Sequence, residues 1–266
     1  NIEIYGLEIE GNEGNQIKFG VSAPYTGEPT SGIRFFGVEN LKIIGAKINK
    51  AKTYGIWLSR VKNGVFRDIE FNQSILTIAN QDGIHFNGLC YNLEISNIRG
   101  VTNDDMIALN ANDVAQGANV SFGEIKNVII KDVIFDNNLN GIRLLSAGNL
   151  LDKISIQNLS GSIRDNVIAI SSYTLGTANF GAISIDNVKV DTTTPFNIMG
   201  EYGGYILVND KIDFLKISNV FRKTGGDARP TVRIQSRANI SKLVIDNITT
   251  VINQSLTTYY PEISFE

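Results

Sequence analysis

The chain repeats a short sequence pattern along its length, and this repetition limits its fold more than any other feature. Asparagine-rich segments with alternating Ile, Val and Leu recur nine times, starting at positions 1, 40, 63, 92, 127, 153, 182, 214 and 242. The mean interval is 241/8, or about 30 residues, a size typical of solenoid repeats. The copy at Asn63 fits the alignment only with a one-residue slip, because Gly64 occupies an apolar position.

The alternation within each repeat has a period of two residues, and Gly and Asn mark the corners between short strands. No stretch keeps a period of 3.6 residues, so helical repeats fit poorly. We therefore expect an all-β fold: a right-handed parallel β-helix of about eight to nine coils, a single domain over residues 1–266, with inward Ile, Leu, Val and Phe stacked along its axis. Asn at corresponding corners tolerates a left-handed backbone conformation and can hydrogen-bond from coil to coil.

A second short strand precedes most of these segments, as in Gly83-Ile-His-Phe-Asn and Met106-Ile-Ala-Leu-Asn. Successive side chains of a strand point to opposite faces, so the residue between the two inward positions points outward. Adjacent coils are about 4.8 Å apart, so these outward residues should form one column on the surface. Coil by coil, the predicted column reads Arg34, Trp57, His85, Ala108, Arg143, Ala169, Leu207 and Arg233.

Acidic residues stand at the same place in two successive repeats, just before this outward column. Asp82 lies in Asn80-Gln81-Asp82-Gly83, and Asp104 and Asp105 open the corresponding strand of the next coil. Such residues also form turns, which is the structural alternative. Clustered like charges repel, however, and at least one of the three should have a raised pKa. We therefore predict that Asp82, Asp104 and Asp105 are catalytic acids and bases of the kind that cleave glycosidic bonds.

Further residues near these acids are candidates for substrate binding. His85 is the only histidine of the chain and can orient a carboxylate or donate to a substrate. Arg143 can hold an anionic or hydroxyl-rich substrate, or instead form a salt bridge with the aspartates. Trp57, the only tryptophan, is expected as an exposed platform on which a sugar ring stacks, or as a residue packed beneath a loop. Arg34 and Asn140 are expected to line the same groove.

Composition excludes several classes of partner. The net charge is −3 and the pI about 5.4, so there is no basic excess to hold nucleic acid or an anionic membrane surface. No apolar run approaches the roughly 20 residues that span a bilayer. Cys90 is the single cysteine, which excludes an internal disulfide and a cysteine metal cluster and predicts a small buried side chain.

The motifs resemble those of a known enzyme family. Asn80-Gln81-Asp82-Gly83, Asp104-Asp105-Met106-Ile107-Ala108 and Gly141-Ile142-Arg143 are similar to the Asn-Thr-Asp, Gly-Asp-Asp-Cys and Arg-Ile-Lys motifs of polygalacturonases, glycoside hydrolase family 28, which share the pectin-lyase-like β-helix. The resemblance implies an inverting hydrolase with Asp105 as general acid and with Asp82 and Asp104 activating water. Acid and base should then be about 6.5–9.5 Å apart. Leu145 replaces the family's lysine, and a Gly-His-Gly coil is missing, which argues against pectin itself as the substrate.

The combination of Asp-Gly-Ile-His with Asp-Asp-Met-Ile-Ala-Leu-Asn looks more like the β-helical domains of bacteriophage tail appendages and tailspikes. This implies a fragment of a longer, extracellular, secreted or virion protein, expected as a homotrimer, that depolymerises capsular polysaccharide or wall teichoic acid without a required cofactor. Three alternatives remain: a polysaccharide lyase with calcium at the acidic cluster, a metal-dependent phosphodiesterase, and a non-catalytic glycan-binding or structural spike.

Overall fold

The computed structural model describes residues 1–15, 31–73, 80–112, 121–172, 177–193, 204–224, 229–235, 238–251 and 262–265. Two parallel sheets run through all of these segments. Sheet 1 consists of β1 (Ile2–Tyr5), β2 (Glu8–Glu10), β4 (Glu39–Ile44), β5 (Lys47–Asn49), β7 (Lys62–Asn72), β9 (Cys90–Val101), β11 (Ile125–Asn138), β13 (Leu151–Ile163), β15 (Phe180–Thr192), β17 (Ile212–Thr224) and β19 (Ile240–Val251). Sheet 2 consists of β3 (Ile33–Phe36), β6 (Ile56–Ser59), β8 (Ile84–Asn87), β10 (Asp105–Asn110), β12 (Asn140–Leu145), β14 (Ile168–Ser171), β16 (Ile206–Val208), β18 (Val232–Ile234) and β20 (Ile263–Phe265).

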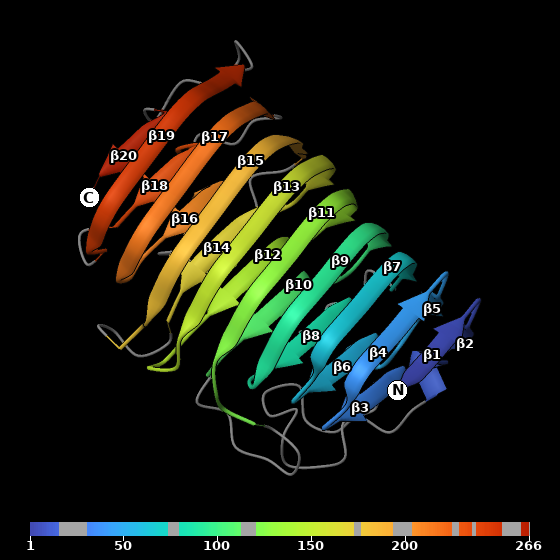
Figure 1. Cartoon of the computed structure of the whole chain (residues 1–266). Coiled ribbons are helices and arrows are strands. Elements are labelled where there is room, and N and C mark those ends of the chain that lie inside the picture. Colours follow the sequence, from blue (N-terminus) through green and yellow to red (C-terminus); the bar gives the residue numbers. More distant parts are fainter. Residues whose placement is uncertain are drawn as a thin grey trace.

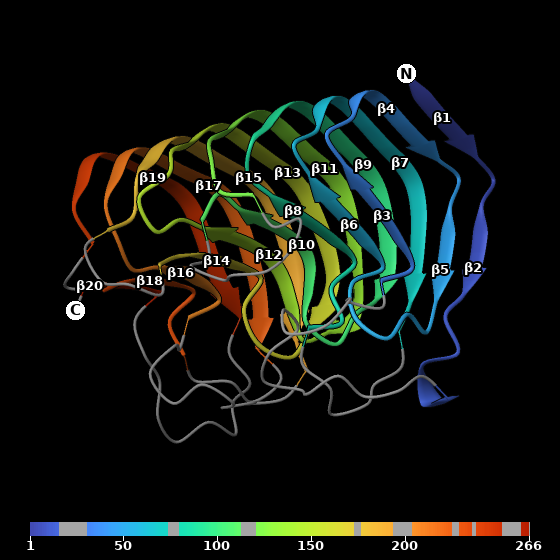
Figure 2. The same ribbon diagram turned by 90° about the horizontal axis from the view of Figure 1, so that it is seen from below.

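The chain alternates between the two sheets, so that each coil adds one strand or strand pair to each. Neighbours in sheet 1 follow the order β1-β4-β7-β9-β11-β13-β15-β17-β19, and sheet 2 has the matching order from β3 to β20. In Figure 1 the long strands of sheet 1 lie in front of the short strands of sheet 2. Figure 2 shows the coils stacked along one axis with the two termini at opposite ends. The prediction of a right-handed parallel β-helix of about eight to nine coils is confirmed.

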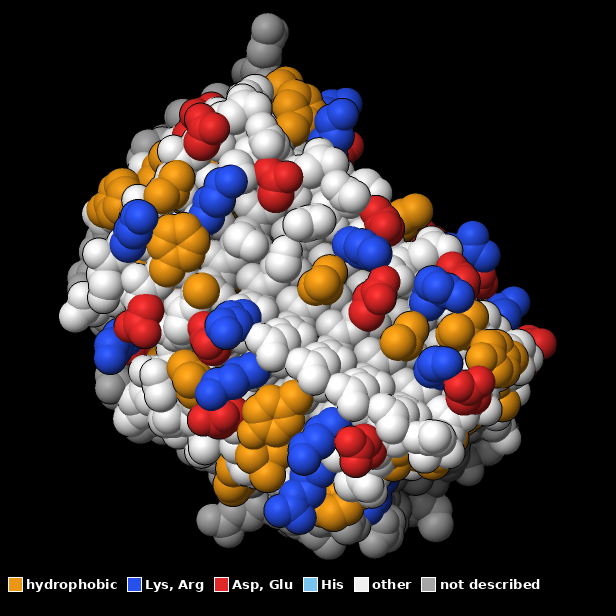
Figure 3. All heavy atoms as spheres, in the orientation of Figure 1, with side chains coloured by type: hydrophobic (Ala, Val, Ile, Leu, Met, Phe, Trp, Pro, Cys, Tyr) orange, Lys and Arg blue, Asp and Glu red, His pale blue; other side chains and the backbone are white. Residues whose placement is uncertain are grey.

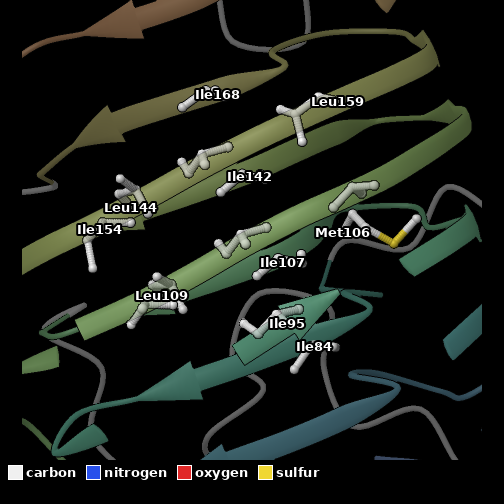
Figure 4. Close-up of a cluster of buried hydrophobic side chains, with 14 of the residues drawn as sticks. Ile84, Ile95, Met106, Ile107, Leu109, Ile142, Leu144, Ile154, Leu159 and Ile168 are labelled. Atoms are coloured by element: carbon white, nitrogen blue, oxygen red, sulfur yellow. The ribbon is translucent and has the colours of Figure 1, made fainter. Parts of the chain in front are cut away.

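Inward side chains stack in columns along the axis. Ile107 pairs with Ile84 on one side and with Ile142 on the other, and the column continues to Ile168. Figure 4 shows these side chains between the two sheets, with Leu109 and Leu144 in the neighbouring column. All of them are almost fully buried. Burying a side chain of this size contributes roughly 1.5–3 kcal/mol, so the core is built from many equivalent contributions. Cys90 is buried too, as expected, and burial raises the pKa of its thiol to about 12.

Asparagines form ladders at the corners of sheet 1, as the sequence predicted. One ladder runs from Asn127 through Asn92, Asn63 and Asn40 to Asn1, with each amide nitrogen donating to the preceding side-chain oxygen over 2.7–3.0 Å. Within it, the φ angles from Asn40 to Asn127 lie between 54° and 58°, in the left-handed region that Asn tolerates better than most residues. The corners are therefore fixed by the same residue type that marks the repeat.

The slip proposed at Asn63 is wrong. Gly64 pairs directly with Leu41 and Leu93, without a register shift. A Cβ atom on Gly64 would lie 2.7 Å from the ring of Phe66, so the missing side chain makes room for that ring. The regular register therefore extends through this coil.

The outer face of sheet 1 carries charges of both signs. In Figure 3 Lys and Arg side chains are interspersed with Asp and Glu, and single hydrophobic side chains lie among them. The 3-10 turn η1 (Glu13–Asn15) is the only helical element in the part of the chain that the structure describes, and nothing there is a helix with the length and apolar character to cross a bilayer.

Candidate active site

The outward face of sheet 2 brings the predicted residues together. Ala108 pairs with His85 on β8 and with Arg143 on β12, and the column continues from His85 to Trp57 and Arg34. Asp105, at the start of β10, pairs with Asn140 at the start of β12. The predicted column is therefore real, because the coils stack without a register shift at this place.

Asp82, Asp104 and Asp105, here called the acid cluster, lie closer together than expected. Each offers one carboxylate oxygen, and these oxygens lie within 4.8 Å of one another. This is shorter than the separation of about 6.5–9.5 Å that an inverting enzyme was expected to show. The cause is the strand spacing, since neighbouring coils are only about 4.8 Å apart and the three acids lie at the starts of the adjacent strands β8 and β10.

Asp105 carries the clearest electrostatic signature. Burial raises the pKa of its carboxyl well above the usual value, and the charges of Asp104 and Asp82 raise it further. Arg143 acts in the opposite direction, because its Nε lies 2.8 Å from Oδ2 of Asp105 and favours the charged form. The raising influences prevail, so the carboxyl of Asp105 keeps its proton to a higher pH than an ordinary aspartate does.

Asp104 is held by hydrogen bonds that suit a carboxylate. The backbone N–H of Asn80 donates to its Oδ2 at 2.9 Å, and Nδ2 of Asn140 donates to its Oδ1 at 3.3 Å. Asn140 thus spans two coils and orients an acid. Its predicted role in substrate binding stays a prediction.

Asp82 is positioned by the only histidine. Nδ1 of His85 lies 2.6 Å from Oδ2 of Asp82, and Nδ2 of Asn110 lies 3.3 Å from Nε2 of His85. An amide that donates to Nε2 leaves the proton on Nδ1, which then donates to Asp82. The ring of Tyr54 stacks on the imidazole with centroids 4.0 Å apart and fixes its plane. His85 therefore orients Asp82.

Trp57 is not the exposed platform that the sequence suggested. Its side chain is 2% exposed, and its Nε1 donates to Oδ1 of Asn87 at 2.7 Å. The guanidinium of Arg34 lies over the ring, 4.6 Å from its centroid. Of the two alternatives for Trp57, the exposed platform is therefore wrong, and a packed side chain is what the structure shows.

Sequence reasoning missed the supporting amides. Asn87 and Asn110 pair with each other at the ends of β8 and β10, two residues after the outward column. The same two-residue period that located His85 puts both side chains on the face of sheet 2 that carries His85. Asn80 acts through its backbone, and no side-chain pattern reports such a contact.

The cluster offers only oxygen ligands. Three carboxylates within 4.8 Å form a donor set that suits a hard cation such as Ca²⁺. The contacts of Asp82 with His85 and of Asp105 with Arg143 already provide partners for two of the three. That the cluster works without a cofactor stays a prediction.

The fold places the protein in a class, the parallel β-helices. Among solved structures, the chain is similar to the endo-xylogalacturonan hydrolase from Aspergillus tubingensis, with a TM-score of 0.65 and 11% identity over 98% of this chain and 74% of that chain. It is also similar to the tailspike protein of E. coli bacteriophage HK620 in complex with a hexasaccharide, with a TM-score of 0.63 and 11% identity over 99% of this chain and 46% of the tailspike.

The family 28 exopolygalacturonase of Yersinia enterocolitica is a third similar structure, with a TM-score of 0.51 and 15% identity over 87% of this chain and 46% of that chain. The chain therefore corresponds to less than half of the exopolygalacturonase and of the tailspike. No family model and no curated protein sequence matches the chain. At these identities the likeness shows a shared fold.

Proposed function

We propose that this β-helix is a glycoside hydrolase that cleaves a repeating extracellular polymer. The observation that carries the proposal is the acid cluster, in which one carboxyl has a strongly raised pKa and lies beside two carboxylates that side chains and backbone hold in place. Pairs of acids whose environments separate their pKa values are typical of acid–base catalysis.

In the proposed reaction Asp105 donates its proton to the glycosidic oxygen as the bond to the anomeric carbon breaks. A water molecule attacks that carbon, and its proton passes to Asp82 or Asp104. His85 and the Asn80 N–H keep these two carboxylates oriented. Arg143 limits how far the pKa of Asp105 rises, so that the proton can leave.

Two observations point in opposite directions on whether the reaction inverts or retains the configuration of the anomeric carbon. The motif resemblance implies inversion, whereas the short spacing of the acid oxygens is closer to the about 5–5.5 Å of retaining enzymes. We propose inversion, with a water molecule entering from the side of the partly exposed Asp104. Proton NMR of the first product formed decides the point, because the initial anomer reports the outcome directly.

The similar structures support a polysaccharide or wall polymer as substrate, a location outside the cell, and either a secreted hydrolase or a phage tail appendage. Capsular polysaccharide and wall teichoic acid are the proposed substrates. In the tail-appendage case a homotrimer is expected, and light scattering coupled to gel filtration measures it.

The test is a panel of capsular, teichoic and pectic polymers incubated with the protein. Reducing ends, ultraviolet absorbance and phosphomonoester release are followed together, with and without EDTA. New reducing ends that persist in EDTA and are lost in Asp105→Asn support the hydrolase. Asp213→Asn serves as the matched control, because Asp213 is an exposed carboxylate on β17.

The other outcomes of this test identify the three alternative functions. Ultraviolet absorbance from an unsaturated product indicates a lyase. EDTA-sensitive phosphomonoester release indicates a phosphodiesterase with a cation at the acid cluster. A polymer that binds wild-type protein and is never cut shows a glycan-binding spike and overturns the proposal.

A further inference from the structure

Several arginines follow the acid cluster along the helix axis, and three of them, Arg143, Arg164 and Arg229, differ in their partners. Arg143 pairs with Asp105 at 2.8 Å, and Arg229 pairs with Asp165. Arg164 is different: its Nε donates to the backbone oxygen of Asn137 at 3.0 Å and its Nη2 to Oδ1 of Asn103 at 3.2 Å. Among the residues that the structure describes, Arg164 has no carboxylate partner.

Arg164 lies at the corner where the chain enters sheet 2, which is also the corner that carries the acid cluster. Its backbone N–H donates to the oxygen of Asn138 at 2.8 Å, and the Asn138 side chain donates to Thr102 at 2.7 Å. These contacts place Arg164 two coils beyond the turn that carries Asp104, or about 10 Å along the axis. Its guanidinium reaches back over that distance to Asn103, the residue before Asp104.

The guanidinium is partly withdrawn from water, and no carboxylate in the described segments pairs with it. Burial lowers the pKa of Arg164, yet a guanidinium remains charged at neutral pH. Two of its five N–H donors are used by neutral acceptors that fix the direction of the side chain. The remaining donors form part of a planar fork whose geometry matches a carboxylate or a phosphate.

We infer that Arg164 binds an anionic group of the polymer, a carboxylate or a phosphate, about 10 Å from the acid cluster on its C-terminal side. The inference rests on the proposed function, because it takes the polymer to lie along the same wall as the acids. It assigns the substrate to the acidic polymers, which the acid cluster by itself does not do.

The test is equilibrium binding, measured by isothermal titration calorimetry on the full chain. The probes are polygalacturonate, poly(glycerol phosphate) and carboxyl-reduced polygalacturonate, which carry carboxylates, phosphates and no charge respectively. A charge-assisted hydrogen bond contributes about 1.5–3 kcal/mol, so Arg164→Gln should raise Kd for the preferred anionic polymer by about tenfold or more. Its affinity for the neutral polymer should not change.

Two further variants separate binding from folding. Arg164→Lys keeps the charge and loses the fork, so it should restore part of the lost affinity. Arg99→Gln is the matched control, since Arg99 lies exposed on sheet 1 beside Glu70 and should leave every Kd unchanged. If Arg164→Gln weakens binding of charged and neutral polymers equally, Arg164 only holds the coils together and the inference is overturned.

The inference also fails if wild-type protein binds neither anionic polymer more tightly than the neutral one. The preferred polymer of the two identifies the anion. Because the titration reports binding and not cleavage, a protein that binds through Arg164 and cuts nothing refutes the hydrolase while supporting the anion site.

Discussion

Replacing Arg143 with Gln tests the electrostatics of the acid cluster most directly. Arg143 is the cation that favours the charged form of Asp105, across 2.8 Å between Nε and Oδ2. The two side chains are 17% and 7% exposed, so the ion pair is largely buried. Removing one partner of a buried pair costs about 3–5 kcal/mol while the other stays charged.

Protonation limits this cost and makes it depend on pH. Burial raises the folded-state pKa of Asp105 above the ordinary value of an aspartate. Its contribution to stability is therefore fully present below about pH 4 and is lost as pH rises through the folded-state pKa. Arg143 reduces that loss, so Arg143→Gln should cost almost nothing near pH 4 and increasingly more, up to about 3 kcal/mol, as pH rises through the folded-state pKa of Asp105.

Urea unfolding of both proteins between pH 4 and pH 8 measures this difference. Arg99→Gln is the control, because an exposed ion pair of this kind contributes about 0–1 kcal/mol and its loss should show no such increase with pH. A cost of Arg143→Gln that stays constant from pH 4 to pH 8 would falsify the coupling between Arg143 and the protonation of Asp105.

The same variant reports the role of Asp105 in the proposed reaction. Loss of Arg143 raises the pKa of Asp105 further. If Asp105 is the general acid, the alkaline limb of the kcat profile moves to higher pH, because the proton is retained longer. If the acid limb moves instead, Asp105 acts as the base and its proposed role is exchanged with that of another member of the cluster.

Three other substitutions probe the scaffold. Trp57→Phe should lower the free energy of unfolding by about 1–2 kcal/mol through loss of the buried indole hydrogen bond, and leave polymer affinity unchanged; weaker binding at unchanged stability would restore the sugar-stacking role. Asn127→Ala should unfold at lower urea than Asn127→Gly, by about 1 kcal/mol, because φ is 58° at this corner; equal midpoints would show that the left-handed conformation costs Ala nothing. Gly83→Ala should destabilise by about 1–3 kcal/mol, since its Cβ would lie 2.5 Å from the oxygen of Met106, whereas Gly14→Ala, with open space around it, should not; similar melting curves for both would contradict the packing argument.

Much of the site could be predicted because a parallel β-helix turns sequence position into location. Side chains along a strand alternate with a period of two residues, which puts His85, Ala108 and Arg143 in one column. The stacking of coils puts Asp82 beside Asp105. The asparagine corners could be predicted for the same reason, since left-handed conformation and ladder formation belong to single residues at repeated positions. Both properties are local or periodic, so no tertiary information was needed.

The predictions that failed concern how far side chains extend and what covers them. The sequence places Trp57 on the outward face, but the bond to Asn87 and the stacked Arg34 make it a buried residue. The alignment suggested a slip at Gly64, but the ring of Phe66 fills the space and keeps the register. Neither outcome can be predicted from the periodicity of the sequence, because each depends on the volume and rotamer of a neighbouring side chain.

The sequence by itself determined the β-helix, the outward column and the position of three acids at one corner. Only the tertiary structure decided that the acid oxygens lie within 4.8 Å, that burial outweighs Arg143 at Asp105, and that Arg164 reaches Asn103 without a carboxylate partner among the described residues. The reason is physical: hydrophobic periodicity and backbone preference fix strands and register, whereas pKa values and ion pairs depend on distances and burial set by side chains from several coils at once.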